Sequence, residues 1–279
     1  MSQLNLLAPA KINLFLHVTG RRSDGYHTLQ TAFQFLNWYD NVDLEANHSG
    51  KIVRHDINST GLPEDDLTIR AARLLQQYSG IRLGADITLR KNIPAGAGLG
   101  GGSSDAAATL MGLNTLWKTH LNQQQLLELA ALLGADVPIF VFGHAAWAEG
   151  IGDELYRIDP EERWYCLVMP DAIVPTAAIF EHPDLKRDTA SVSIGDLPDF
   201  SSVNDLEAVT RTTHPIVDRA FSRIGAAHKP QLNGSGSSIF LPCNSEQDAE
   251  RIAAELARGQ LETRVCRAYN SHPHLNLVS

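Results

Sequence analysis

The chain has 279 residues and a formal net charge of -9. This length suits one large domain or two ordinary ones, and the 43% hydrophobic content is enough for a buried core. The acidic balance argues against a nucleic-acid partner, because such proteins usually present a basic face. An anionic ligand would therefore need positive charge gathered locally.

The cysteines and the N-terminal residues indicate the cellular setting. Cys166, Cys243 and Cys266 are odd in number and far apart, so the sequence predicts neither a zinc site nor a disulfide framework. Polar residues such as Lys11 and Asn13 interrupt the first apolar stretch, which is not typical of a signal peptide. No apolar run reaches membrane-spanning length. We expect a protein of the reducing cytoplasm that binds no membrane.

The first half of the chain begins with strands. Residues 9–18 (PAKINLFLHV) alternate with period two, which predicts a strand with one polar face. Its two predicted faces are Ile12, Leu14, Leu16 and Val18 on one side and Lys11, Asn13, Phe15 and His17 on the other. Residues 21–25 predict a turn, residues 27–45 further strands, residues 67–78 a helix and residues 85–91 another strand. Because several strands precede the first helix, we expect an α+β fold.

Residues 94–108 (PAGAGLGGGSSDAAA) are the most informative stretch, with five glycines and two serines between a predicted strand and a predicted helix. Glycine allows positive φ and lets backbone N–H groups approach an anion closely. We predict a helix from Ala106 to about Trp117, capped by Ser103 or Ser104, whose N-terminus faces bound phosphate. The stretch therefore predicts a nucleotide-binding loop.

Two other kinds of nucleotide loop do not fit. A Walker-type loop needs a lysine after the glycines, and none follows here. Gly96, Gly98 and Gly101 satisfy the spacing of a dinucleotide fingerprint, but that motif also needs a second strand that ends in an acidic residue. Residues 122–133 (NQQQLLELAALL) have helical spacing instead, so Glu128 lies within a helix. A plain flexible loop is disfavoured because the run continues directly into a helix.

The second half of the chain predicts the order β-α-β-β-α-β. Strands are expected at residues 165–170, 230–234, 237–242 and 262–269, and helices within 176–182, 204–226 and 245–258. This order is the signature of a ferredoxin-like sandwich. The polar stretch 184–202 predicts a loop within this half.

Three segments together resemble the motifs of the GHMP small-molecule kinases: residues 9–13 (PAKIN), residues 94–107 and residues 233–238 (NGSGSS). Residues 24–27 (DGYH) and 134–138 (GADVP) extend the resemblance over nearly the whole chain. It implies an N-terminal ribosomal-S5-like α/β domain over residues 1–160, which binds ATP and carries out catalysis. It also implies a C-terminal ferredoxin-like α/β sandwich over residues 161–279.

Within this family, the motifs resemble those of a kinase for a cytidine diphosphate alcohol in isoprenoid biosynthesis. The implied reaction is ATP-dependent phosphorylation of the 2-hydroxyl, which gives the 2-phosphate and ADP. The resemblance places the catalytic aspartate at Asp136, where a turn before Pro138 would present it, and the active-site lysine at Lys11. From the residues alone, Asp136 would more often be a turn or cap aspartate, and an isolated lysine such as Lys11 is usually a solvated surface residue.

The resemblance also implies which residues bind each ligand. Tyr26 and His27 would flank the cytosine, although both could instead pack a hairpin. The implied substrate-binding residues are Asn13, Tyr26, His27, Thr176, Phe180, Gly234 and Ser235, of which Phe180 could equally be a core residue. The implied nucleotide-binding residues are Asp66, Lys91, Pro94, Gly96, Gly98, Leu99, Gly100, Gly101, Gly102, Ser103 and Ser104.

Two positions depart from the pattern of this family. Asp66 stands where asparagine is expected, and a carboxylate accepts but does not donate hydrogen bonds, which weakens an adenine contact there. Asn233 stands where threonine or serine is common. Lys91, just before the glycine run, is implied to help hold the nucleotide, but it could as well be a solvated lysine at the end of a strand.

ATP is expected as its Mg²⁺ complex, and Ser103 or Ser104 could be a ligand of the ion, with no dedicated metal site in the protein. We expect a monomer or a weak homodimer. The alternative functions are another GHMP kinase, acting on homoserine, mevalonate or a sugar, and, much less favoured, an NAD-binding oxidoreductase.

Overall fold

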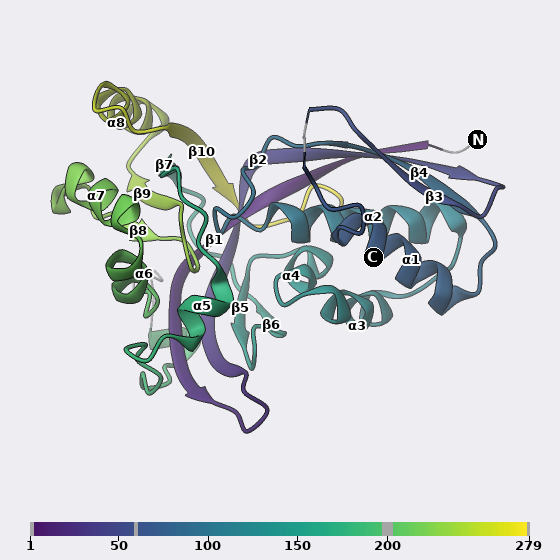
Figure 1. Ribbon diagram of the computed structural model, residues 1–279, viewed down its shortest axis with the longest axis horizontal. Helices are drawn as coiled ribbons and strands as arrows, with labels where there is room; N and C mark the ends of the chain where they lie inside the picture. The colour runs from purple at the N-terminus through teal and green to yellow at the C-terminus, as the bar shows by residue number, and fades with distance from the viewer. Residues whose placement is uncertain (1–2, 59–60, 197–202, 278–279) are drawn as a thin grey trace.

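The computed structural model describes residues 3–58, 61–196 and 203–277. Its strands form one sheet in which β3, β4, β2, β10, β7, β9 and β8 are successive neighbours, while β1 and β5 also pair with β2, and β6 pairs with β5 (Figure 1). The strands are β1 (Gln3–Arg21), β2 (His27–Asn47), β3 (Ile52–Asp56), β4 (Gly84–Arg90), β5 (Ala146–Glu149), β6 (Glu154–Arg157), β7 (Trp164–Val168), β8 (Gln231–Leu232), β9 (Ile239–Cys243) and β10 (Thr263–Tyr269). The α-helices are α1 (Leu67–Ser79), α2 (Gly101–Trp117), α3 (Gln123–Leu133), α4 (Val137–Phe142), α5 (Thr176–Glu181), α6 (Glu207–Thr213), α7 (Pro215–Ile224) and α8 (Glu246–Arg258).

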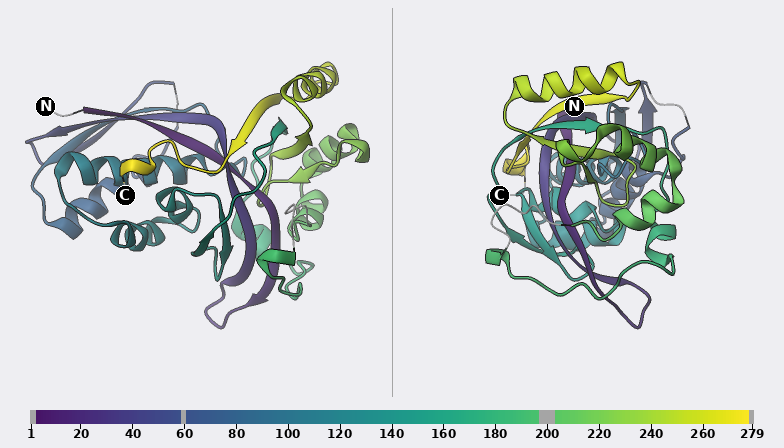
Figure 2. Two further views of the ribbon diagram at one scale, coloured as in Figure 1. Left: turned by 180° about the vertical axis from the view of Figure 1, so that it is seen from behind. Right: turned by 90° about the vertical axis from the view of Figure 1, so that its left-hand side faces the viewer.

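A long antiparallel hairpin of β1 and β2 runs through both halves of the molecule (Figures 1 and 2). The predicted polar face of β1 is correct for Lys11 and Asn13, which share a face and are hydrogen-bonded to each other, but both side chains are buried. Lys11 and Asn13 are only 2% and 4% exposed. A register shift between Asn13 and Phe15 also breaks the alternation. As a result Phe15 packs in the same cluster as Ile12, on the opposite side from its predicted face.

In the N-terminal half, α1 to α4 cover one face of the sheet formed by β1, β2, β4 and β3 (Figure 1). The predicted helix at 67–78 and strand at 85–91 are confirmed as α1 and β4. The helix predicted at 122–133 is α3, whose N-cap residue Asn122 accepts a hydrogen bond from the Gln125 N–H. Apolar side chains of the helices and strands form one buried cluster here.

In the C-terminal half, the strand order β10-β7-β9-β8 is antiparallel throughout. With α5 to α7 between β7 and β8, and α8 between β9 and β10, this is the predicted ferredoxin-like arrangement. The described part of the predicted loop, up to residue 193, has no helix or strand, and a short 3-10 turn follows at Ile194–Asp196. Residues 197–202 of this loop lie outside the described residues. The division of the chain after residue 160 stays a prediction.

The glycine run itself begins helix α2, which corrects the predicted start at Ala106. Gly100 is the N-cap residue with a left-handed backbone (φ 74°), and no side chain among the described residues caps the helix. A Cβ at Gly101 would lie 3.0 Å from Ile93 Cγ2 and 3.1 Å from Asp40 Oδ2. Glycine therefore lets the helix begin directly against the preceding strands. Ser103 and Ser104 lie inside its first turn, so the predicted serine cap is wrong.

Helix α2 is buried on almost every side, which makes its interior glycine sensitive to volume. An alanine Cβ at position 112 would lie 2.4 Å from Leu44 Cδ1 and 2.6 Å from Leu6 Cδ1. Although alanine favours a helix by about 1 kcal/mol over glycine, overpacking a core costs about 1–3 kcal/mol. We expect Gly112→Ala to lower the free energy of unfolding by about 1 kcal/mol in urea titrations.

Gly195→Ala is the matched control, because a Cβ there meets nothing within 4 Å and its φ lies outside the left-handed region. Its stability should equal that of the wild type. A Gly112→Ala protein as stable as the control would show that Leu44 and Leu6 move aside without cost.

Candidate functional site

The glycine loop, residues 91–100, is bound to segments that lie far away in sequence. The Lys11 N–H donates to the carbonyl oxygen of Leu99 (2.9 Å), and the Ser238 N–H donates to that of Ala97 (3.1 Å). The side-chain amide of Asn233 donates to the carbonyl oxygen of Gly98 (3.1 Å). These carbonyl groups are thus occupied, and the loop leads into the N–H groups of the first turn of α2, which have no helical acceptor. Backbone N–H groups at the start of α2 are thus left without a protein acceptor within the helix, and phosphate binding at them stays a prediction.

Two clefts meet at this loop. The first, called the hairpin cleft, has a volume of 680 Å³ and lies between the β1–β2 hairpin, α5 and the segment before α4. The second, called the loop cleft, has a volume of 440 Å³ and lies between the glycine loop and the start of α1. Gly98, Gly100 and Ser103 line both clefts. A phosphoryl group held at these residues could therefore pass from one cleft to the other.

Apart from the three residues that line both clefts, the predicted substrate-binding and nucleotide-binding residues lie in different clefts. The hairpin cleft is lined by both predicted catalytic residues and by all predicted substrate-binding residues: Lys11, Asp136, Asn13, Tyr26, His27, Thr176, Phe180, Gly234 and Ser235. Every predicted nucleotide-binding residue except Ser104 lines the loop cleft. Ser104 is fully buried behind it. A larger cleft of 810 Å³ beside α6 contains none of the predicted residues in its described lining.

Lys11 and Asp136 form an ion pair at the end of the hairpin cleft. Lys11 Nζ lies 3.2 Å from Asp136 Oδ2, and the lysine side chain is 3% exposed whereas that of Asp136 is 40% exposed. Lys11 is therefore not a solvated surface lysine. Asp136 directly precedes α4, but its side chain makes no capping hydrogen bond to that helix. Its carboxylate remains accessible to a ligand and is paired with a buried cation.

A chain of side-chain amides fixes the position of Lys11. Its ammonium donates to Asn13 Oδ1 (2.7 Å), and Asn13 Nδ2 donates to Thr31 Oγ1 (2.9 Å). Thr31 in turn donates to the carbonyl oxygen of Phe15. The backbone N–H of Asn13 donates to Asn233 Oδ1 (2.9 Å). Asn13 therefore orients the catalytic candidate as well as lining the cleft.

The late segment 233–238 closes the other side of the hairpin cleft. Gly234 has a left-handed backbone (φ 55°), and a Cβ there would lie 3.4 Å from Asn13 Oδ1 and 3.7 Å from Lys11 Nζ. Glycine thus keeps side-chain atoms away from the ion pair. The hydroxyl groups of Ser235 and Thr176 lie 2.8 Å apart, which joins this segment to α5.

Aromatic rings and a histidine form the far end of the hairpin cleft. Tyr26 is 62% exposed at the tip of the β1–β2 hairpin, whereas His27 is 8% exposed. The rings of His27 and Phe180 are tilted by 30° with centroids 5.3 Å apart. Phe180 is half-buried and also packs against the C-terminal core. Arg187 Nε donates to His27 Nε2 (3.0 Å).

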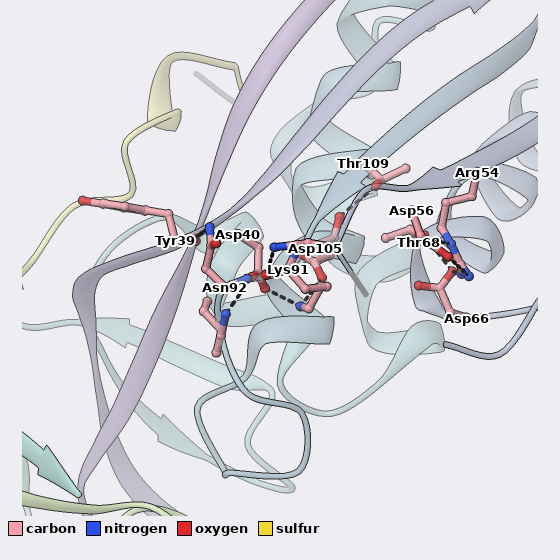
Figure 3. A network of polar contacts seen from close by, with 12 residues as sticks. Tyr39, Asp40, Arg54, Asp56, Asp66, Thr68, Lys91, Asn92, Asp105 and Thr109 are labelled. Carbon is pink, nitrogen blue, oxygen red and sulfur yellow. Dashed lines mark hydrogen bonds and ion pairs between the residues drawn. The ribbon is translucent and has the colours of Figure 1, made fainter. Parts of the chain in front are cut away.

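A buried ion-pair network lies at the start of the glycine loop (Figure 3). Lys91 Nζ donates to Asp40 and, at 2.6 Å, to Asp105 Oδ2, and the lysine side chain is 13% exposed. Asp40 also accepts the Ile93 N–H (2.8 Å). Lys91 is therefore not a solvated strand-end lysine, and its positive charge is already paired. Burial, opposed by Lys91 and reinforced by Asp40, raises the pKa of Asp105 to about 7.

The carboxylate of Asp66, at the edge of the loop cleft, is likewise engaged by hydrogen bonds and an ion pair (Figure 3). Its side chain caps α1 by accepting the Ile69 N–H (3.1 Å), and it also accepts from Thr68 Oγ1 (2.7 Å). Arg54 Nη1 lies 2.6 Å from the same carboxylate oxygen. The acid at this position is thus neutralised by an arginine from the neighbouring strand β3, which sequence reasoning did not find.

Of the oxygen atoms suited to Mg²⁺, the carboxylates of Asp66 and Asp105 in the loop cleft are already paired with Arg54 and Lys91. Ser103 lines both clefts, whereas the hydroxyl of Ser104 is buried without a hydrogen-bond partner among the described residues. Nowhere in the described ranges do three His, Cys, Asp or Glu side chains gather as a metal site. Such a donor set fits an ion held mainly by phosphate and water, with Ser103 as the protein group in reach.

Comparison with known proteins identifies the family. The model of the GHMP kinase N-terminal domain matches residues 66–144, and that of the GHMP kinase C-terminal domain matches residues 189–261. The 4-diphosphocytidyl-2-C-methyl-D-erythritol kinase of Aromatoleum aromaticum is 47% identical over 270 residues, which cover 95% of this chain and 93% of the relative. The chain belongs to the GHMP kinases.

Solved structures agree with this assignment. A crystal structure of 4-(cytidine 5'-diphospho)-2C-methyl-D-erythritol kinase superposes with a TM-score of 0.81 at 32% identity, covering 95% of this chain and 99% of the other. Homoserine kinase from Cytophaga hutchinsonii shares the fold, with a TM-score of 0.74 at 16% identity over 98% and 96% of the two chains. The predicted GHMP kinase fold is confirmed. As a GHMP kinase the chain uses ATP as phosphoryl donor, so the loop cleft is the candidate ATP site.

Other findings on this GHMP kinase concern the cysteines and the helices. Cys166, Cys243 and Cys266 are all free and buried. Among the described residues, none of the helices is long and apolar enough to cross a bilayer.

Sequence reasoning missed the residues that support the site. Asp40, Thr31 and Arg187 carried no signal, because each is isolated in sequence and acts through a partner 16 to 160 residues away. Asp105 lies within the glycine-rich motif, but its partner Lys91 could not be inferred from the motif. From the sequence, Asn233 stands out only because threonine or serine is common at this position in the family. Its side chain contacts the Lys11 strand and the glycine loop at once.

Asn233 offers a direct test of this support. A leucine of similar size would leave the Asn13 N–H and the carbonyl oxygens of Lys11 and Gly98 without their partner in a fully buried position. Each unpaired buried group costs about 1–3 kcal/mol. We expect Asn233→Leu to lower the free energy of unfolding in urea by at least about 2 kcal/mol.

Asn244→Leu is the control, because Asn244 is exposed and should tolerate the same change. Equal stability of the two variants would mean that Asn233 is not a structural junction.

Proposed function

We propose that this GHMP kinase phosphorylates the 2-hydroxyl of 4-diphosphocytidyl-2-C-methyl-D-erythritol with ATP, giving the 2-phosphate and ADP in isoprenoid biosynthesis. The relative from Aromatoleum aromaticum, which carries this name, supports the proposal by its identity over nearly the whole chain. The observation that carries it is the hairpin cleft. The cleft has an acid–base pair beside the phosphate loop at one end and aromatic rings at the other.

The chemistry follows from this arrangement. The substrate hydroxyl, seated beside Asp136, attacks the γ-phosphorus of ATP, and the bond from that phosphorus to the β–γ bridging oxygen breaks. The hydroxyl proton passes to the Asp136 carboxylate, which acts as general base. Lys11 balances negative charge on the transferring group and holds Asp136 in place. Because Lys11 is buried, its charge acts in a low dielectric and is more effective than it would be in water.

ATP would bind in the loop cleft, with its phosphates against the glycine loop and the first turn of α2. We propose that Mg²⁺ accompanies the nucleotide, with the hydroxyl of Ser103 as the protein group beside it. When bound, the ion neutralises phosphate charge. Lys91 and Asp66 would act mainly by shaping this cleft, since both are already paired with protein side chains.

The cytosine would lie at the far end of the hairpin cleft. Tyr26 is exposed there and offers a ring face for stacking, while Phe180 lies beside His27. His27 can hydrogen-bond the edge of the base. Asn13, Thr176, Gly234 and Ser235 would then contact the methylerythritol and diphosphate parts between the two ends.

The setting of this reaction is part of the same proposal. The buried free thiols fit a reducing cytoplasm. The net charge of -9 disfavours a nucleic-acid partner. We propose that the protein is a monomer or weak homodimer that acts on a small molecule and has no membrane partner.

A substrate panel tests the proposed function. We expect ADP release with Mg-ATP and 4-diphosphocytidyl-2-C-methyl-D-erythritol, and none above background with mevalonate, homoserine or galactose at equal concentration. The reason is that the aromatic end of the hairpin cleft contributes binding only to the cytidine compound. Turnover of one of the other alcohols would keep the phosphate loop but contradict the cytosine site.

The catalytic pair is tested by Asp136→Asn and Lys11→Ala. Both should lower kcat at least about 100-fold, because a general base and a charge-stabilising group each contribute that much. ATP affinity, measured by calorimetry, should change little, since neither residue lines the loop cleft. Asp153→Asn, an exposed carboxylate outside both clefts, is the matched control. Turnover near the wild-type rate in both catalytic variants would remove them from the mechanism.

A further inference from the structure

His27 makes a hydrogen bond that determines where its proton lies. Arg187 Nε donates to His27 Nε2 at 3.0 Å. A guanidinium has only donors, so His27 Nε2 must carry the lone pair. In a neutral imidazole the proton is then on Nδ1. Burial, followed by the positive charges of Arg187 and Arg21, lowers the pKa of His27, which favours this neutral form.

Arg187 is itself held in place by the backbone around α5. Its Nη1 donates to the carbonyl oxygen of Leu185 (3.0 Å), and its Nη2 donates to those of Phe180 (2.9 Å) and His182 (2.7 Å). The guanidinium therefore has few ways to turn away from the imidazole. The Phe180 ring beside His27 limits rotation of the imidazole in the same way.

The opposite edge of the imidazole remains for a ligand. His27 lines the hairpin cleft, whereas Arg187 does not appear in its described lining. With Nε2 bound to Arg187, the edge left over carries the Nδ1–H group. The imidazole therefore has one donor, Nδ1–H, left for a ligand bound at the aromatic end of the cleft.

We propose that Arg187 is a specificity-determining positioning residue, which fixes His27 as an Nδ1–H donor and so selects a pyrimidine with an acceptor at N3. This inference rests on the proposed function. Cytosine has a lone pair at N3 and can accept from His27. Uracil has an N–H group at N3, so two donors would face each other and the His27 donor would lose its partner on binding.

The size of the discrimination follows from the cost of an unpaired polar group. Such a group costs about 1–3 kcal/mol, which corresponds to a difference of roughly 10- to 100-fold in kcat/KM. A histidine free to change tautomer could instead accept from the uracil N–H. Removing Arg187 should therefore relax the selection more than it weakens binding of cytidine.

The experiment compares Arg187→Met, Arg187→Lys and the control Arg163→Met, an arginine outside both clefts. kcat/KM is measured for 4-diphosphocytidyl-2-C-methyl-D-erythritol and for its uridine counterpart. In parallel, ¹⁵N NMR of the imidazole nitrogens reports the tautomer, with the His27 signals assigned from a His27→Asn spectrum. We expect the wild type and Arg163→Met to favour cytidine at least about tenfold and to show protonated Nδ1.

Arg187→Met should lower the cytidine-to-uridine ratio at least about tenfold and give mixed tautomers at His27. Arg187→Lys, whose ammonium is also only a donor, should keep protonated Nδ1 and most of the ratio. Loss of the contacts to the α5 backbone alone would weaken both substrates equally and leave the ratio unchanged. An unchanged ratio in Arg187→Met, or protonated Nε2 in the wild type, would overturn the proposal.

The two proposals fail in different ways. If the wild type turns over neither pyrimidine compound, the proposed function fails, while the NMR spectra still decide whether Arg187 sets the His27 tautomer. If cytidine is turned over but the variant keeps both the ratio and the tautomer, only the role of Arg187 is overturned.

Discussion

The side-chain amide of Asn233 joins the three parts of the site. Its oxygen accepts from the Asn13 N–H, and its nitrogen donates to the carbonyl oxygens of Lys11 and Gly98. The early strand, the glycine loop and the late segment thereby meet at one fully buried group. Because buried backbone groups must be paired, any displacement of one segment would leave polar groups of the other two unsatisfied. The geometry of both clefts depends on this junction.

The burial of Lys11 is the main electrostatic feature of the site. Removing an ammonium from water is costly unless oxygen atoms surround it. Here Asn13 Oδ1 and Asp136 Oδ2 do so, and the ring of Phe33 lies 5.5 Å below the ammonium. Asn13 supplies a neutral acceptor, and among the described residues Asp136 is the only carboxylate paired with Lys11. The same contacts that make burial of the charge tolerable also hold the lysine side chain against Gly100 of the glycine loop.

Most charged side chains that line the loop cleft are paired, and the exposed Arg70 is the exception among the described residues. Lys91 is shared by Asp40 and Asp105, and Arg54 is paired with Asp66. In the proposed function, phosphate binding in this cleft would rely on backbone N–H groups, the helix N-terminus, Arg70 and a cation that arrives with the nucleotide. This explains how a chain with an acidic balance can hold a polyanion without a basic surface patch. The paired lysine and arginine instead stiffen the segments on which the loop rests.

The sequence by itself determined most of the elements, though not β3, α4, β5 or β6, and it determined the ferredoxin-like order of the second half and the glycine loop, because periodicity and glycine spacing are local signals. It also indicated Lys11, Asp136, Tyr26 and His27, through motifs that resemble a family. It did not determine that α2 begins at Gly101, because that start depends on close packing against Ile93 and Asp40. The shift of Phe15 to the other face of β1 depends on a register shift against β2. Only the tertiary structure decided which polar groups are paired, since the partners of Asn233, Lys91 and His27 lie 14 to 222 residues away.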